Sequence, residues 1–371
     1  MKKVILIFLY WLFFLFLVNK FSIFIIPNRT SYELPPDLTV PRRSVFLPWL
    51  NFDGRNYLDI VLQGYFTKGQ FDLRVFFPLY PLLIKFFSLN LILNPVIIGL
   101  LISWFAFLTG SLLFYRLLKE EERENIAFKS FLLLLLFPSS FFFLAFYTES
   151  LFFLLVILAF WFVREEKFLL ASITAALASA TRIVGLALFP ALLWEGYQVL
   201  RKKKKFPLSI FVAPLGLLIY LGYTWWATGV ALTIFSKHQA WARPIGFLGP
   251  YFAIKDWIVK VLAGPQTIYD SPFVYPVIVI ELATAIFVAI IIFLSFRKIK
   301  ISYWIYLLAS FIIILLRGVL SALPRYALVL FPMYVYLGKT FSKRALVVWG
   351  FVSLFFLMIF SALFLRGYWV G

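Results

Sequence analysis

The sequence predicts an all-helical protein that crosses a membrane many times. Of its 371 residues, 63% are hydrophobic and 21% are aromatic, whereas only 14% are charged. The mean hydropathy of +0.97 exceeds what the core of a water-soluble protein absorbs. The apolar residues also gather in runs long enough for membrane helices, which is typical of a polytopic membrane protein. We therefore expect a single integral membrane domain over residues 1–371.

Hydropathy along the chain predicts about 11 crossings. The apolar spans cover residues 4–26, 91–118, 130–147, 149–163, 168–181, 183–200, 207–227, 273–296, 302–320, 326–338 and 345–365. Several are shorter than the ~20 residues that a perpendicular helix needs, so we expect local thinning of the bilayer or paired short helices. The first span follows the basic start Met1-Lys2-Lys3 and precedes no small-residue cleavage site, so we expect an uncleaved first helix.

Basic residues between the spans predict the orientation. Lysine and arginine gather in alternate short loops, and the densest run is Arg201–Lys205. By the positive-inside rule these loops are cytoplasmic, and so is the N-terminus. Two long loops, residues 27–90 and 228–272, then lie on the extracytoplasmic face. Because these topology signals explain the formal net charge of +19, we expect membrane lipids as partners and no nucleic acid.

The first outer loop holds most of the residues that suggest chemistry. Asp53 lies between Phe52 and Gly54, past the first apolar span, where a carboxylate meets both water and lipid. The run Phe76-Phe77-Pro78-Leu79-Tyr80-Pro81 adds a stiff aromatic surface at interfacial depth. Each feature also has a simpler interpretation. Asp-Gly is a common turn, and an aromatic run is typical of an anchor for a membrane helix.

Taken together, the motifs resemble the PIG-V family, the GPI mannosyltransferase II-like enzymes of the GT-C class. The first luminal loop of that family typically has a Trp-Asp, a tyrosine, a Gly-Tyr, an acidic residue and then Phe-Phe-Pro-x-Tyr-Pro. The matching residues here are Phe52-Asp53, Tyr57, Gly64-Tyr65, Asp72 and Phe76–Pro81, with phenylalanine in place of tryptophan. Three later motifs continue the resemblance in order: Tyr147–Phe152, Ala178–Gly185, where Val184 replaces the usual asparagine, and Pro324-Arg325-Tyr326.

The resemblance implies a GT-C-like fold and inverting transfer of a hexose, namely mannose, from a polyprenyl-phosphate donor to a lipid or glycan acceptor at the extracytoplasmic face. Such a transfer needs a base for the proton of the acceptor hydroxyl and cations for the departing phosphate. Because a phosphate leaving group needs no general acid, one carboxylate suffices and no divalent metal is required. Asp53 is our candidate base. Asp72 is the candidate second acid of the catalytic site, or else a solvated loop residue.

Arg182 and Arg325 are the candidates for holding the phosphate. Arg182 ends a short run of small residues, and its alternative role is an interfacial arginine that reaches toward the headgroups. Arg325 follows Pro324 at an expected outer turn, and its alternative role is that of an ordinary turn residue. Further substrate-binding candidates lie in or near the outer loops: Tyr80, Glu149, Lys237, His238, Arg243 and Arg317. Glu149 is equally suited to a helix cap.

Other function classes leave weaker traces in the sequence. There is no cysteine, His238 is the single histidine, and neither a P-loop nor H-E-x-x-H occurs, so we expect no nucleotide-sugar domain and no zinc site. A transporter or flippase for polyprenyl-linked lipids predicts ionisable residues at mid-membrane, and Glu281 is one; we expect it to form a buried hydrogen bond between helices. A non-enzymatic scaffold leaves the outer charges unexplained. The membrane is the plasma membrane in a prokaryote and the endoplasmic reticulum in a eukaryote.

Overall fold

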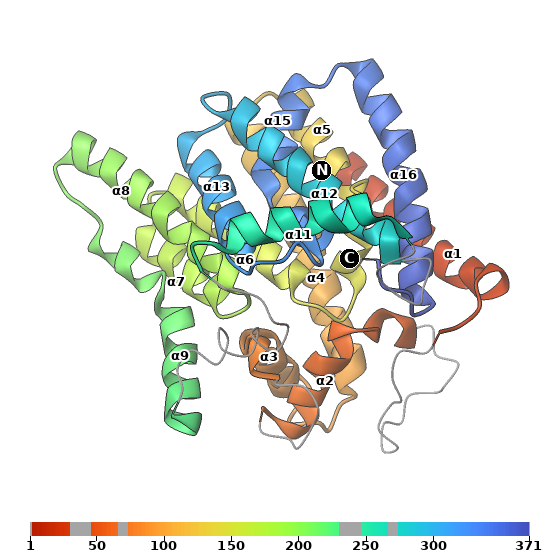
Figure 1. Cartoon of the computed structure of the whole chain (residues 1–371). Helices are drawn as coiled ribbons and strands as arrows, with labels where there is room; N and C mark the ends of the chain where they lie inside the picture. The colour runs from red at the N-terminus through yellow and green to blue at the C-terminus, as the bar shows by residue number, and fades with distance from the viewer. Residues whose placement is uncertain (1, 30–45, 66–72, 230–245, 266–273, 371) are drawn as a thin grey trace. The chain divides into compact units, whose positions relative to one another are not determined.

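The computed structural model describes residues 2–29, 46–65, 73–229, 246–265 and 274–370. These residues form helices and no strand (Figure 1). Within them, six helices are long and apolar enough to cross a membrane, judged by length and composition, and shorter apolar helices accompany them. The protein is therefore an all-α protein embedded in a membrane, as its hydropathy predicts.

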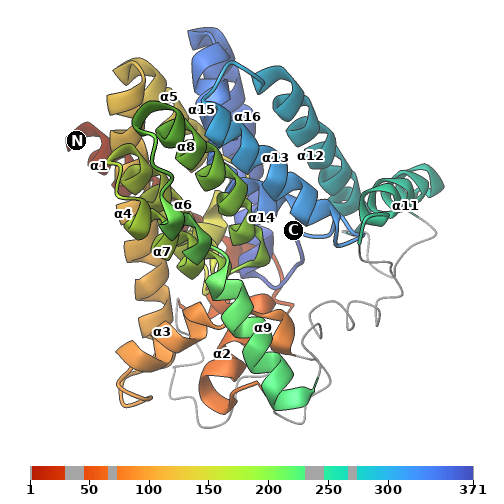
Figure 2. The ribbon, with the colours of Figure 1, turned by 90° about the vertical axis from the view of Figure 1, so that its left-hand side faces the viewer.

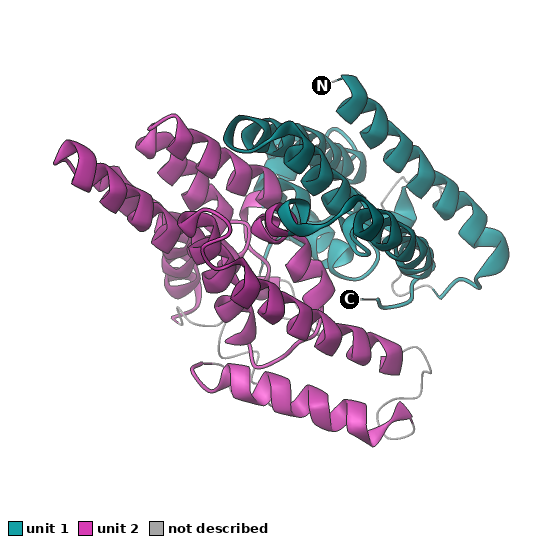
Figure 3. Cartoon of the chain, turned by 90° about the horizontal axis from the view of Figure 1, so that it is seen from above, with its two compact units in different colours: residues 1–67, 80–151, 337–371 teal, residues 68–79, 152–336 magenta. Residues whose placement is uncertain are grey.

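The chain divides into two compact units, which Figure 3 colours separately. Unit 1 comprises residues 1–67, 80–151 and 337–371. Its helices are, in order, α1 (Lys2–Ile25), η1 (Leu47–Leu50), α2 (Asp53–Gln63), α3 (Leu79–Phe87), α4 (Pro95–Glu121), α5 (Glu124–Leu135), η3 (Ser140–Leu144) and α16 (Lys343–Leu365). Helix α1 packs against α16 and α4, and α4 packs against α5 and η3.

Unit 2 comprises residues 68–79 and 152–336. Its helices are η2 (Leu73–Val75), most of α6 (Glu149–Arg164), α7 (Phe168–Ser179), η4 (Ile183–Ala187), α8 (Leu188–Lys203), η5 (Leu208–Val212), α9 (Leu215–Thr228), α11 (Gly249–Ala263), α12 (Val274–Ser295), α13 (Ile301–Leu315), α14 (Leu323–Leu328) and most of α15 (Phe331–Thr340). Helix α7 packs on α9, and α12 packs on α11, α13 and α14. Figure 2 shows α11 beside one end of α12.

The structure corrects the predicted span of residues 130–147. Helix α5 ends at Leu135, and the chain passes through the short 3-10 turn η3 before α6 begins at Glu149. Pro138 explains the break, because proline has no N–H and disfavours a helical conformation in the residue before it. The predicted span 326–338 is likewise divided between α14 and α15. The structure does not reproduce the count of about 11 crossings, since only six described helices meet the length and hydropathy expected of one.

The segment between α5 and α6 is irregular yet buried: every residue from Ser139 to Ser150 is shielded from solvent. Its backbone carbonyls need partners within the protein, because neither lipid nor bulk water reaches them. Side chains supply these partners at distances of 2.5–3.3 Å: Ser140 donates to the carbonyl of Leu135, Trp104 to that of Leu144, Ser103 to that of Tyr147, and Ser150 to that of Phe143. The irregular segment is therefore fixed from several directions.

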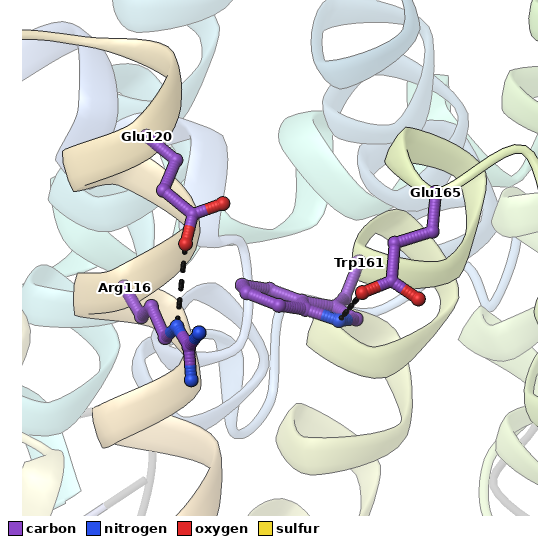
Figure 4. A network of polar contacts seen from close by, with 4 residues as sticks. All are labelled: Arg116, Glu120, Trp161 and Glu165. Carbon is purple, nitrogen blue, oxygen red and sulfur yellow. Dashed lines mark hydrogen bonds and ion pairs between the residues drawn. The ribbon is translucent and has the colours of Figure 1, made fainter.

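Charged residues near helix ends form local pairs. On α4, Arg116 Nε lies 3.2 Å from Glu120 Oε1, and the Trp161 indole N–H of α6 donates at 2.9 Å to Glu165, which directly follows that helix (Figure 4). Both pairs are four residues apart, which is the spacing that brings side chains onto one face of a helix. Because both pairs are exposed to solvent, they contribute little to stability.

Gly216 allows α9 to approach α7 closely. A Cβ built on Gly216 would overlap the carbonyl oxygen of Ala176, whereas a Cβ on Gly222, in the same helix, would meet nothing within 4 Å. We expect Gly216→Ala to destabilise the protein by about 1–3 kcal/mol, because the two helices must move apart.

Gly222→Ala is the matched control. It should be neutral or stabilising, since alanine favours a helix more than glycine does. Thermal unfolding of the detergent-solubilised protein measures both effects. Equal midpoints for the two variants would contradict the packing of α9 on α7.

Candidate functional site

Unit 1 places Asp53 at the first residue of α2, with its side chain partly exposed. The Tyr147 hydroxyl holds the backbone on both sides of Phe52. It donates to the Asn51 carbonyl at 2.8 Å and accepts from the Asp53 N–H at 3.1 Å. A rigid backbone that presents a reachable carboxylate suits a residue that takes a proton from a substrate.

Phe52 is the strained residue of this turn. Its φ of 60° is left-handed, a conformation that costs a non-glycine residue about 1–3 kcal/mol. The Phe52 ring packs on Phe364 and Trp369, with centroids 5.9 and 5.1 Å away, and Asn51 Nδ2 donates to the Phe364 carbonyl at 2.8 Å. These contacts hold the turn, so that Asp53 and Gly54 begin a helix and do not form the Asp-Gly turn that was the simpler interpretation of the sequence.

Tyr80 lies in the core of unit 1. Its side chain is fully buried, and its hydroxyl contacts the Gly99 carbonyl at 2.9 Å and Ser103 Oγ at 3.0 Å. Burial raises the pKa of the Tyr80 hydroxyl well above its ordinary value, so the group stays protonated. The structure thus places Tyr80 in the packed core of unit 1, and its contact with a substrate stays a prediction.

Glu149 begins α6 and is fully buried. It follows Thr148, whose hydroxyl lies 3.4 Å from the hydroxyl of Tyr57 on α2. A carboxylate in the first turn of a helix is favoured by the N–H groups that point toward it. This position agrees with the structural alternative for Glu149, and its contact with a substrate stays a prediction.

Helix α2 also carries an ion pair that the sequence analysis did not use. Arg55 Nε lies 2.9 Å from Asp59 Oδ1, and both side chains are largely buried. Partial burial raises the pKa of Asp59, and the Arg55 guanidinium opposes that shift. Arg55 Nη1 is buried and has no hydrogen-bond partner among the described residues, so it retains a donor for a ligand oxygen. The four-residue spacing of the pair was the signal that could have revealed it.

Unit 2 gathers three arginines around the ring of Tyr326. The guanidinium carbons of Arg182 and Arg317 lie 4.5 and 4.4 Å from the ring centroid, and that of Arg325 lies 5.7 Å away. These distances are typical of cation–π contacts. Arg182 is 7% exposed and Arg325 is 6% exposed. Three cations held together in weakly polar surroundings suit an anion, and a guanidinium matches the geometry of a phosphate.

Arg182 lies at a break between helices, and Arg325 lies in a short helix. Arg182 is extended, with φ −156° and ψ 142°, between α7 and η4. The chain folds back directly after it because Gly185 has no Cβ, which would overlap the backbone of Ala178. Arg325 lies in α14, one turn after Ala322, whose φ is +63°. The sequence predicted both arginines but not that Tyr326 is the ring they share.

Arg317 has the clearest unused hydrogen-bonding capacity of the three. Its Nη2 donates to the Ser321 carbonyl at 3.4 Å, a long contact. Its Nε and Nη1 atoms are buried and have no hydrogen-bond partner in the part of the chain that the structure describes. Buried donors are normally satisfied, so these two N–H groups are available to an anion. From its position in the sequence, Arg317 was only a further candidate.

The remaining predicted residues lie outside the described ranges. These are Asp72, Lys237, His238 and Arg243. Within the described ranges, no group of three or more His, Asp or Glu side chains could hold a metal ion. A surface cavity of about 340 Å³ is lined by Tyr115, Arg116, Lys119 and Glu120. All four belong to α4, and none is a predicted site residue.

Tyr147→Phe tests the clamp on Asp53. The variant loses the hydroxyl that bridges Asn51 and Asp53, so we expect a loss of about 1–3 kcal/mol of stability. Tyr57→Phe is the matched control, because its hydroxyl makes a longer contact, 3.4 Å, with Thr148 and does not bridge Asn51 and Asp53. Thermal unfolding should show a clearly lower midpoint for Tyr147→Phe than for Tyr57→Phe. The reverse order would show that the Tyr147 hydroxyl does not hold this turn.

Comparisons with known proteins do not identify a family or a function for this chain. The chain matches no protein-family model, no curated protein and no solved structure. The resemblance of its motifs to the PIG-V family therefore remains an expectation from the sequence.

Proposed function

We propose that this protein is a glycosyltransferase of the GT-C type that moves a hexose, mannose by the resemblance of its motifs, from a polyprenyl phosphate to a lipid or glycan acceptor. The observation that carries the proposal is the set of three guanidinium groups around Tyr326, which suits a lipid phosphate. The candidate base Asp53, whose backbone N–H is held by the Tyr147 hydroxyl, also supports the proposal. We further propose that the reaction occurs at the extracytoplasmic face, because the basic loops favour that orientation.

In the proposed reaction the acceptor hydroxyl oxygen attacks C1 of the hexose from the side opposite the phosphate. The bond between C1 and the phosphate oxygen breaks, and its electron pair leaves with the polyprenyl phosphate. Asp53 takes the proton of the acceptor hydroxyl as the new bond to C1 forms. Arg182, Arg317 and Arg325 bind the phosphate and stabilise the charge that it gains. The attack inverts the configuration at C1, and none of these steps requires a metal ion.

The transporter alternative gains no support from Glu281. A transporter would use an intramembrane carboxylate to bind an ion or a substrate. Both oxygens of Glu281 instead accept hydrogen bonds from the protein, from the Trp257 indole and from the Ala322 N–H. The expected hydrogen bond between helices is confirmed. The three arginines around Tyr326, which we call the arginine cluster, are therefore the stronger indication of function.

Asp53→Asn should abolish sugar transfer. The amide keeps the shape of the side chain but cannot take a proton, so we expect the rate to fall on the order of 10²–10⁴-fold. The assay uses purified protein in nanodiscs, a radiolabelled polyprenyl-phosphate mannose and a crude lipid extract as the source of acceptor. Glu120→Gln, which changes an exposed carboxylate of α4, is the control and should retain activity. Full activity in Asp53→Asn would exclude Asp53 as the base.

Arg182→Ala combined with Arg325→Ala should weaken donor binding. Loss of two charge-assisted hydrogen bonds, each contributing about 1.5–3 kcal/mol, should raise the KM for the donor at least about 100-fold. Arg201→Ala, an exposed arginine in the last turn of α8, is the control. An unchanged donor KM in the double variant would rule out the arginine cluster as the phosphate site.

A further inference from the structure

Glu281 is a carboxylate within the most apolar of the long helices. It lies in α12, whose mean hydropathy reaches 3.0, and it is 2% exposed. A carboxylate in such surroundings is costly unless hydrogen bonds satisfy it. The proposed reaction gives Glu281 no chemical step, so its presence needs another explanation.

Two donors from different segments satisfy this carboxylate. The Trp257 indole N–H on α11 donates to Oε2 at 2.9 Å, and the backbone N–H of Ala322 donates to Oε1 at 2.7 Å. Lys260 and Arg317 interact with the carboxylate electrostatically. Glu281 thus connects α11, α12 and the residue that precedes α14.

The backbone of Ala322 connects Glu281 to the arginine cluster. Its φ of +63° is left-handed, which costs alanine about 1 kcal/mol and needs support from its surroundings. Its N–H is held by Glu281, and its carbonyl accepts from the N–H groups of Arg325 and Tyr326 at 3.1 Å each. The peptide groups on either side of Ala322 therefore connect Glu281 to the two residues at the centre of the cluster.

We propose that Glu281 is a positioning residue that holds Ala322 in its left-handed conformation and thereby places Arg325 and Tyr326 in the anion site. The inference rests on the proposed function for its choice of ligand, a lipid phosphate. The competing explanation is that Glu281 serves only as a counter-ion for Arg317. The two explanations predict opposite signs, because removing a negative charge near the cluster should tighten anion binding, whereas losing the geometry should weaken it.

The test measures binding of farnesyl phosphate to the purified full chain in nanodiscs. In Glu281→Gln, one acceptor oxygen becomes an N–H₂ donor that opposes either the indole N–H of Trp257 or the N–H of Ala322. We expect binding about tenfold weaker than in the wild type. Trp257→Phe removes the opposing indole N–H, so in the double variant the amide oxygen of the substituted side chain is left to accept from Ala322. Binding in the double variant should return to within about threefold of Trp257→Phe alone.

Each outcome decides the proposal. Tighter binding in Glu281→Gln would establish the counter-ion role and overturn positioning. Weaker binding that Trp257→Phe does not restore would also overturn it. If Glu281→Gln yields no folded protein, the double variant carries the test alone: it must fold and bind within about threefold of Trp257→Phe, and failure of either contradicts the proposal.

A second readout separates this inference from the proposed function. The chain has no cysteine, so Ser321→Cys accepts a single nitroxide label next to Ala322. If the wild type binds no farnesyl phosphate, or if Arg182→Ala with Arg325→Ala binds it normally, the phosphate site is wrong. The label then still tests positioning, because Glu281→Gln should increase its mobility and Trp257→Phe in the same chain should reverse the increase. An unchanged spectrum would overturn the positioning role.

Discussion

Unit 1 depends on satisfying the backbone of a buried segment that is not helical. Between α5 and α6 the chain has lost its helical hydrogen bonds, and nothing in an apolar environment replaces them except the protein itself. Ser103, Trp104, Ser140 and Ser150 donate to the carbonyls of this region. These hydrogen bonds fix the segment, and Tyr147 near its end contacts the turn that precedes α2.

Tyr147 shows how that support reaches the candidate base. Its carbonyl is held by Ser103, and its hydroxyl holds the backbone of Asn51 and Asp53. The strain at Phe52 is sustained because these contacts and the packing on Phe364 over-determine the turn. Tyr147 therefore holds the backbone of Asp53 although the two residues are 94 positions apart in the sequence.

In unit 2 as well, a buried polar group fixes the backbone around it, and here the acceptor is a carboxylate. The buried carboxylate of Glu281 accepts hydrogen bonds from Trp257 on α11 and from the backbone N–H of Ala322, which precedes α14. Ala322 is left-handed and lies between Glu281 and the helix that carries Arg325. In both units a polar group placed in apolar surroundings has few acceptable partners, and that scarcity specifies one geometry. The contacts of Tyr147 position Asp53 in unit 1, and those of Glu281 support the arginines around Tyr326 in unit 2.

The sequence predicted the parts of the fold that hydropathy alone decides. The expected span 273–296 is α12 (Val274–Ser295), and 345–365 is α16 (Lys343–Leu365). It failed where local chemistry overrides an apolar run: Pro138 ends the span 130–147, and 326–338 is two short helices. Asp53 could be chosen as an acidic residue of the expected outer loop, and Arg182 and Arg325 as charged residues at an expected helix end and an expected outer turn. Tertiary contacts between distant segments could not be predicted from the sequence. They create the burial of Tyr80, the clamp by Tyr147 and the shared ring of Tyr326.

The most direct measurement is a cryo-EM structure of the protein bound to an unreactive phosphonate analogue of polyprenyl-phosphate mannose. We expect the phosphonate to contact the guanidinium groups of Arg182, Arg317 and Arg325 beside Tyr326. A phosphonate bound away from Tyr326 would contradict this account.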